Sequence, residues 1–131
     1  AIVAMTGAEP THTLIASNLE QLLRRALASR GCLVLGRDQR VRVEHRYFYP
    51  DVVVACGARH FADDKPSSLL NPKVIIEVTS DTTGLRDWTK KRKHYQRIAS
   101  LSQYVIVDCP EPSGAAAVTV NYVPYCHVIC Q

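Results

Sequence analysis

Two short and almost continuous apolar runs, each carrying a single acid, constrain the fold more than any other feature of this chain. Asp51 to Cys56 reads DVVVAC, and Val74 to Val78 reads VIIEV. Runs of this kind belong to central strands that are covered on both faces, because a half-exposed strand would alternate apolar and polar residues. A chain of 131 residues has room for one domain in which helices cover such a sheet.

The spacing of apolar residues predicts the other elements. A helix is expected from Pro10 to Arg30, ended by Gly31, with an apolar stripe made of Ile15, Leu19, Leu22, Leu23 and Ala26. A second helix is expected from Gly84 to about Ala99. Further strands are predicted at Cys32 to Leu35, Val41 to Val43, Tyr104 to Val107 and 117–123. The fold class is therefore α/β, with a mixed central sheet in a single domain 1–131, while the tail 124–131 carries no interpretable pattern.

Composition narrows the class of protein. Hydrophobic residues make up 47% of the chain and charged residues 21%, which is enough apolar content for a core and too little charge for a disordered chain. No apolar run approaches the roughly 18 residues that span a bilayer, and no secretory signal is visible. We therefore expect a cytoplasmic protein with no membrane partner.

The five cysteines form no CxxC pair. An odd and sparse set of this kind predicts reduced thiols in the core or at strand edges, not a disulfide scaffold. Cys126, His127 and Cys130 lie close together in sequence, and a metal site formed by these residues is the alternative hypothesis. No second ligand pair follows at the spacing of a structural zinc site, so the first explanation is preferred.

Positive charge is concentrated in the second helix. From Arg86 to Arg97 there are six basic residues and one acid, although the net charge of the whole chain is only +4. Such a patch suits a polyanion, because each neutralised phosphate releases counterions. A solvated helix face kept basic for solubility explains the charge equally well, so charge alone leaves both explanations open.

The acids in the two apolar runs are the strongest candidates for chemistry. If the two strands pair antiparallel, Asp51 lies opposite Glu77 and both side chains project on one sheet face, about 5 Å apart. Two buried carboxylates at that distance repel each other. A bridging cation relieves the repulsion, and oxygen ligands favour Mg²⁺ or Mn²⁺. The alternative is that each acid binds an arginine or caps a loop at the rim of the sheet.

Helical geometry places two basic residues of the second helix near its buried stripe. At about 100° per residue, Lys91 falls about 60° from the inward stripe through Trp88, Tyr95 and Ala99. Arg92 lies at a similar angle on the other flank, so this geometry does not decide between them. Lys91 can also run past the core edge and pair with Asp87. On the opposite side of the helix, where side chains can stay hydrated, lie Lys90, Lys93 and Arg97.

The first helix offers two accessory candidates. His12 and Asn18 lie within about 60° of its apolar centre, so either could face the two acids across the sheet. A histidine near a helix start is more often a packing residue than a site residue.

Taken in order, these motifs resemble the Uma2-type proteins, a bacterial group described as restriction endonucleases within the PD-(D/E)xK nuclease superfamily. The resemblance covers roughly Met5 to Asp108. Its motifs are Met5-Thr6-Gly7 with His12 and Asn18-Leu19, the run YPDVVV, Asn71-Pro72, Ile76-Glu77-Val78, Ser80, Thr82-Thr83, Asp87, Lys91, Tyr95, Ser100-Leu101 and the run YVIVD.

The resemblance implies a restriction-endonuclease-like fold and a Mg²⁺- or Mn²⁺-dependent hydrolysis of DNA phosphodiester bonds. Asp51 matches the aspartate of the PD pair, and Glu77 matches the acid of the (D/E)xK element. Thr79 stands where the superfamily usually has lysine, and Lys91 matches a lysine on the following helix that replaces it. With the carbonyl of Val78, the two acids would hold the metal, while Lys91 would orient a water or stabilise the developing oxyanion.

The resemblance also implies partners. The residues expected to contact the DNA backbone are Lys90, Arg92, Lys93 and Arg97, and the accessory positions are His12, Asn18, Asp87 and Tyr95. A homodimer is expected, because cutting both strands needs two sites. The start of the chain looks shortened relative to the family. The alternatives are a catalytically degenerate nucleic-acid-binding protein of the same fold and a relative that binds another protein.

Overall fold

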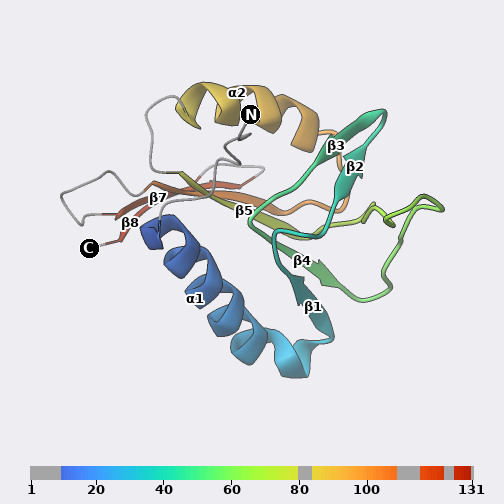
Figure 1. The fold of residues 1–131 in the computed structure, drawn as a ribbon, viewed down its shortest axis with the longest axis horizontal. Coiled ribbons are helices and arrows are strands. Elements are labelled where there is room, and N and C mark those ends of the chain that lie inside the picture. Colours follow the sequence, from blue (N-terminus) through green and yellow to red (C-terminus); the bar gives the residue numbers. More distant parts are fainter. Residues whose placement is uncertain (1–9, 80–83, 109–115, 123–125, 131) are drawn as a thin grey trace, which may run out of the picture.

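A mixed sheet forms the centre of the structure, a computed structural model that describes residues 10–79, 84–108, 116–122 and 126–130 (Figure 1). The sheet has six strands in the order β1-β4-β5-β6-β7-β8. Their bounds are β1 Cys32–Leu35, β4 Val52–Cys56, β5 Val74–Thr79, β6 Gln103–Asp108, β7 Ala116–Tyr122 and β8 Cys126–Cys130. β5 and β6 run parallel, and the other neighbouring strands run antiparallel. The predicted mixed α/β class is confirmed.

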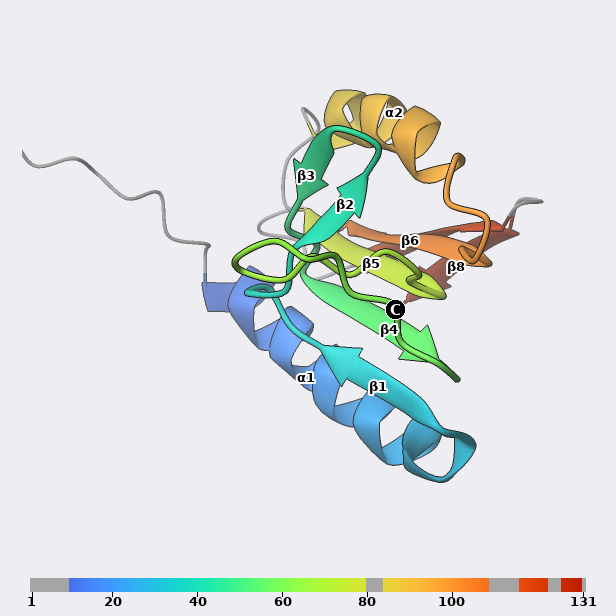
Figure 2. The same cartoon turned by 90° about the vertical axis from the view of Figure 1, so that its right-hand side faces the viewer.

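Two helices cover opposite faces of this sheet (Figure 2). α1, Pro10–Leu27, continues into the 3-10 turn η1, Ala28–Arg30. It ends at Gly31, whose φ of 68° lies in the left-handed region that glycine adopts without steric cost. α2, Gly84–Tyr95, lies on the other face. It is shorter than predicted, and Ala99, which was expected to face inward, is exposed.

The two faces of β4 have separate cores, which explains its continuous apolar run. Val52 and Val54 pack on the side of α1, whereas Val53 and Ala55 pack on the side of α2. All four residues are at most 1% exposed. The run DVVVAC therefore encodes a strand that is covered on both faces, as predicted.

The face of α1 that contacts the sheet differs in part from the prediction. Its partly buried residues are Ile15, Ala16, Leu19, Leu23 and Leu27. Leu22 is 61% exposed, and Ala26 is also exposed. The buried row runs at intervals of four from residue 15 to residue 27, and residues 22 and 26 are each turned about 100° away from it.

A second, two-stranded sheet covers part of the α2 side. It pairs β2, Val41–Val43, with β3, Arg46–Phe48, in an antiparallel hairpin. β2 was predicted and β3 was missed. Phe48 packs against Tyr95 of α2 with ring centroids 4.9 Å apart. The hairpin therefore lies beside α2 and closes the same core (Figure 1).

The C-terminal tail contains a strand that the sequence did not reveal. Residues 126–130 form β8, which pairs antiparallel with β7. The side chains of Cys126, His127 and Cys130 lie outside the described residues, so the metal question there stays a prediction. Within the described ranges, no helix is long and apolar enough to cross a bilayer.

The prediction of reduced thiols is wrong for one pair of cysteines. Cys32 and Cys56 lie directly opposite each other in the register of β1 and β4, and they form a disulfide with a Cα–Cα distance of 4.0 Å. The two residues are 24 positions apart in sequence, and their proximity depends on a strand register that cysteine counting does not reveal. The bond joins the edge strand β1 to the central strand β4.

Candidate functional site

Asp51 and Glu77 meet at the end of the β4–β5 pair. The antiparallel register of β4 with β5 sets Val52 opposite Ile76. The next residue pair in this register sets Asp51 opposite Glu77, as predicted for antiparallel strands. The Oδ2 atom of Asp51 accepts a hydrogen bond from the backbone N–H of Val78 at 2.8 Å. This bond fixes the carboxylate of the first acid beside the strand that carries the second.

Two donors from different elements hold the Glu77 carboxylate. The Nζ atom of Lys91, from α2, lies 2.9 Å from Oε1. The hydroxyl of Tyr104, from β6, donates to Oε2. Lys91, and not Arg92, is therefore the basic residue of α2 that reaches Glu77, which helical geometry alone had left open.

Two tyrosines in edge-to-face contact lie near the acids. The rings of Tyr95 and Tyr104 are 4.9 Å apart and nearly perpendicular, and both side chains are buried. Burial raises the pKa of each hydroxyl above its usual value, and the negative charges of Glu77 and Asp51 raise it further. Both hydroxyls therefore remain protonated around neutral pH, and both carboxylates lie near them.

Tyr104 is the site residue that sequence reasoning missed. The parallel register sets Tyr104 beside Ile75, and Ile75 shares its sheet face with Glu77 by the period of two. Alternation within YVIVD could show that Tyr104 and Ile106 share a face. It could not show which face, because that depends on the pairing of β5 with β6.

His12 adds a polar contact from α1. Its Nε2 atom lies 3.4 Å from Oδ2 of Asp51, so this accessory candidate does reach the site. Among the described residues, the Nδ1 atom of His12 and the hydroxyl of Tyr95 are buried without a hydrogen-bond partner. Such atoms are rare in native proteins and are usually completed by a ligand, an ion or a water. A water or another polar ligand can complete the hydroxyl of Tyr95 near the carboxylates.

Two other accessory candidates have different outcomes. Asn18 is exposed and lines a surface hollow with Gln21, Leu22 and Arg25. The structure therefore does not bring Asn18 to the two acids, because its side chain lies on the exposed side of α1. The side chain of Asp87 lies outside the described residues, so its pairing with Lys91 stays a prediction.

The predicted DNA-contacting residues lie on or just after α2. Lys90 and Lys93 are exposed, and Arg92 is partly buried. Arg97 follows the helix and is already paired, because its Nη1 atom lies 3.0 and 2.9 Å from the two carboxylate oxygens of Glu44. This exposed ion pair ties the end of α2 to the turn of the β2–β3 hairpin.

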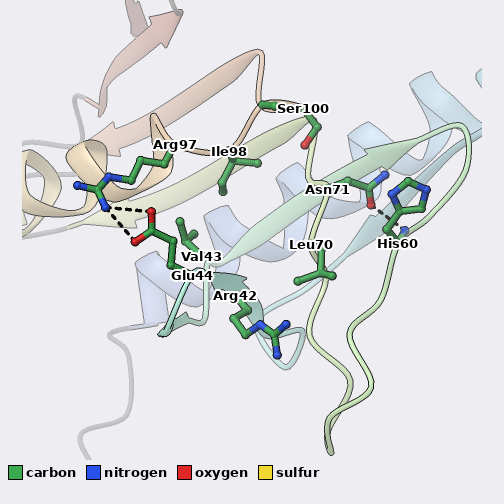
Figure 3. A pocket seen from close by; sticks show the side chains of 10 residues that line it. Arg42, Val43, Glu44, His60, Leu70, Asn71, Arg97, Ile98 and Ser100 are labelled. Carbon is green, nitrogen blue, oxygen red and sulfur yellow. Dashed lines mark hydrogen bonds and ion pairs between the residues drawn. The ribbon is translucent and has the colours of Figure 1, made fainter.

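A separate hollow of about 500 Å³ adjoins that ion pair (Figure 3). Its floor is apolar, with Val43, Leu70 and Ile98, and its polar rim includes Arg42 and His60. Asp51, Glu77 and Lys91 are not among its lining residues. The hollow is therefore distinct from the cluster around the two acids.

The donor set at the acids fits a hard cation better than zinc. Among the described residues, no three His, Cys, Asp or Glu side chains are grouped so as to hold a metal ion, and a structural zinc site requires four such ligands. Mg²⁺ commonly takes one or two carboxylates and retains several waters. Two acids beside buried polar atoms that lack a partner suit that mode of binding.

The chain is a mixed α/β protein, and its fold matches that of a solved structure. The chain is similar to a structure described as a putative nuclease belonging to DUF820, from Anabaena variabilis ATCC 29413. The TM-score is 0.64 at 15% identity, covering 93% of this chain and 68% of that chain. At this identity the likeness establishes the fold alone.

Sequence comparison then establishes the family. The model of the Uma2 family, described as "Putative restriction endonuclease", matches residues 1–121, and the chain belongs to that family. It is also 30% identical over 109 residues to an uncharacterized protein of Synechocystis sp. (strain ATCC 27184 / PCC 6803 / Kazusa). That match covers 82% of this chain and 62% of the relative, so the chain spans less than two thirds of the relative's length.

Proposed function

We propose that this chain is a Mg²⁺-dependent endonuclease that hydrolyses DNA phosphodiester bonds. The observation that carries the proposal is the convergence of Asp51, Glu77 and Lys91, from two strands and a helix, on one end of the sheet. Membership of a family described as restriction endonucleases supports the same reaction class.

In this proposal Asp51, Glu77 and the backbone carbonyl of Val78 hold Mg²⁺ or Mn²⁺. The bound ion would lower the pKa of a water and offset the charge that builds on the scissile phosphate. The oxygen donors and the partnerless hydroxyl of Tyr95 support this assignment.

Other groups of the chain would orient the two acids and the reacting water or phosphate. Lys91 carries the positive charge nearest Glu77, so its ammonium group can orient a water or stabilise an anionic phosphate. The Tyr104 hydroxyl, kept protonated by burial and by the adjacent carboxylate, holds Glu77 in one orientation. The backbone N–H of Val78 does the same for Asp51.

Contacts with the DNA backbone are assigned to Lys90, Arg92, Lys93 and Arg97. Lys90 and Lys93 are exposed and available, whereas Arg97 must exchange Glu44 for a phosphate. Binding should weaken steeply with salt, because each phosphate contact releases counterions. Cleavage of both strands would need two copies of the site, so we propose a homodimer, which sedimentation of the protein with and without DNA would test.

The decisive experiment is nicking of supercoiled plasmid DNA with Mg²⁺, against the same reaction in EDTA. Asp51→Asn and Glu77→Gln should each lower the rate by at least about a hundredfold, while retaining the circular dichroism of the wild type. Asp38→Asn, the same chemical change at an exposed position, should leave the rate unchanged. Full activity of either site variant, or activity in EDTA, would refute the assignment.

One observation favours a second candidate function. Lys91 and Tyr104 occupy both oxygens of Glu77, so the carboxylate is already satisfied without a metal. A nucleic-acid-binding protein that does not cleave would have this arrangement together with the same basic helix. Calorimetry with Mn²⁺ separates the two functions: binding that Glu77→Gln weakens supports the nuclease, and absence of binding supports the non-cleaving protein.

A further inference from the structure

The outward face of the β2–β3 hairpin exposes two large aromatic side chains. Tyr47 is 50% exposed and Tyr49 is 51% exposed. Phe48, between them, turns inward onto the rings of His94 and Tyr95. Because side chains of an extended chain alternate between faces, Tyr47 and Tyr49 share the outward face. Exposed rings grouped in this way mark an interaction surface more often than isolated exposed residues do.

Two arginines lie beside Tyr47. The guanidinium carbon of Arg40 lies 4.5 Å from the centre of the Tyr47 ring, and Arg42 lies opposite Tyr47 in the hairpin register. Both arginines contact one carboxylate, that of Asp64, at 3.1 and 3.6 Å. Two positive charges on one acid leave the surface basic, which suits a polyanion.

The aromatic face leads to the two acids. Tyr49 is followed by the buried Pro50 and then by Asp51, so the aromatic face ends beside the proposed site. At the far end, the ion pair of Glu44 with Arg97 holds the hairpin turn against the end of α2. Figure 2 shows the hairpin beside α2, with β3 leading towards β4.

We infer that Tyr47 and Tyr49 are stacking platforms for unpaired nucleobases of a single-stranded nucleic acid whose backbone continues to Asp51. The inference rests on the proposed function for its substrate class. Aromatic rings interleaved with arginines are the usual chemistry of single-strand binding, because every base has a face that can stack. In a blunt duplex the bases are already stacked on one another, so this surface favours single strands or frayed ends.

The test is the affinity of the whole protein for fluorescein-labelled oligo-dT and oligo-rU, measured by anisotropy in EDTA, with a blunt hairpin duplex of equal charge as comparison. Tyr47→Leu with Tyr49→Leu should weaken single-strand binding by about tenfold or more and change duplex binding by less than about twofold. Tyr47→Phe with Tyr49→Phe keeps both rings and should bind as the wild type does. The two labelled strands show whether the site prefers deoxyribose or ribose.

Phe61→Leu is the matched control, because Phe61 is another exposed aromatic, separated from β3 by β2 and Leu69. It should leave single-strand affinity unchanged. The inference is overturned if the leucine pair binds oligo-dT as tightly as the wild type, if Phe61→Leu weakens binding equally, or if the pair alters only the oligomeric state in sedimentation. Since no cleavage is measured, failure of the nuclease assay with intact stacking would refute the proposed function and leave this inference standing.

Discussion

The hydrogen bond from Tyr104 to Glu77 gives the sharpest prediction about the site. Tyr104→Phe removes one hydroxyl oxygen and keeps the ring in place against Tyr95. The lost bond is made to a carboxylate from a buried donor, and bonds to charged groups contribute about 1.5–3 kcal/mol. We therefore expect the free energy of unfolding to fall by about that amount. With a urea slope of roughly 1–3 kcal/mol/M, the urea midpoint should fall by about 1 M.

Tyr95→Phe is the matched control. It removes an equally buried hydroxyl, but one with no hydrogen-bond partner among the described residues. Removing a polar group that is already unsatisfied relieves its desolvation cost, so stability should stay within about 0.5 kcal/mol or rise. Urea unfolding followed by circular dichroism measures both variants. Equal losses in the two would show that the rings, and not the bond to Glu77, set the cost, and would refute the reasoning.

Three further predictions follow from other contacts. Lys91→Met should lower kcat for plasmid nicking by about a hundredfold. Lys90→Met should instead raise KM and reduce the salt dependence of binding without lowering kcat. Steady-state nicking rates at two salt concentrations measure both variants. The raised pKa of Tyr95 and Tyr104 means that the folded state keeps both protons at a pH where the unfolded state loses them. Titration of the two tyrosines therefore leaves the free energy of unfolding unchanged below pH 10 and lowers it as pH rises above 10. The free energy of unfolding should then fall by about 2–3 kcal/mol per pH unit, and absorbance at 295 nm should show two of the six tyrosines ionising only with unfolding. Cys56→Ser should lower stability by about 2–4 kcal/mol, because the bond closes a loop of 24 residues; a wild-type melting curve for that variant would contradict this.

The central part of the site could be predicted from sequence because it depends on few variables. Once DVVVAC and VIIEV are both taken as central strands, antiparallel pairing with the acids opposed is one of a small number of registers. The observed pairing of Val52 with Ile76 is that register. Helical geometry narrowed the basic residue that reaches the acids to Lys91 or Arg92. Only the placement of α2 over Glu77 distinguished between the two.

The features that sequence analysis missed all depend on long-range placement. Tyr104 becomes a partner of Glu77 only through the parallel pairing of β5 with β6. Cys32 and Cys56 are joined only because β1 lies beside β4. β3 was missed because RYF is too short to show a period and is stabilised by Phe48 packing on α2. Local sequence patterns predict most of the helices and strands. The contacts between these elements become known only from the fold.

The position of the lysine shows why spacing along the chain is a weak guide to a site. Thr79 lies two residues after Glu77 on the same strand, so a lysine at that position would share the face of Glu77 and could present a charge there. The charge comes instead from Lys91, fourteen positions away, whose ammonium group lies 2.9 Å from Oε1. A long, flexible side chain on a helix packed over the sheet can reach the same carboxylate from above. What the chemistry requires is a positive charge near that oxygen, and either a strand neighbour or an overlying helix can supply it.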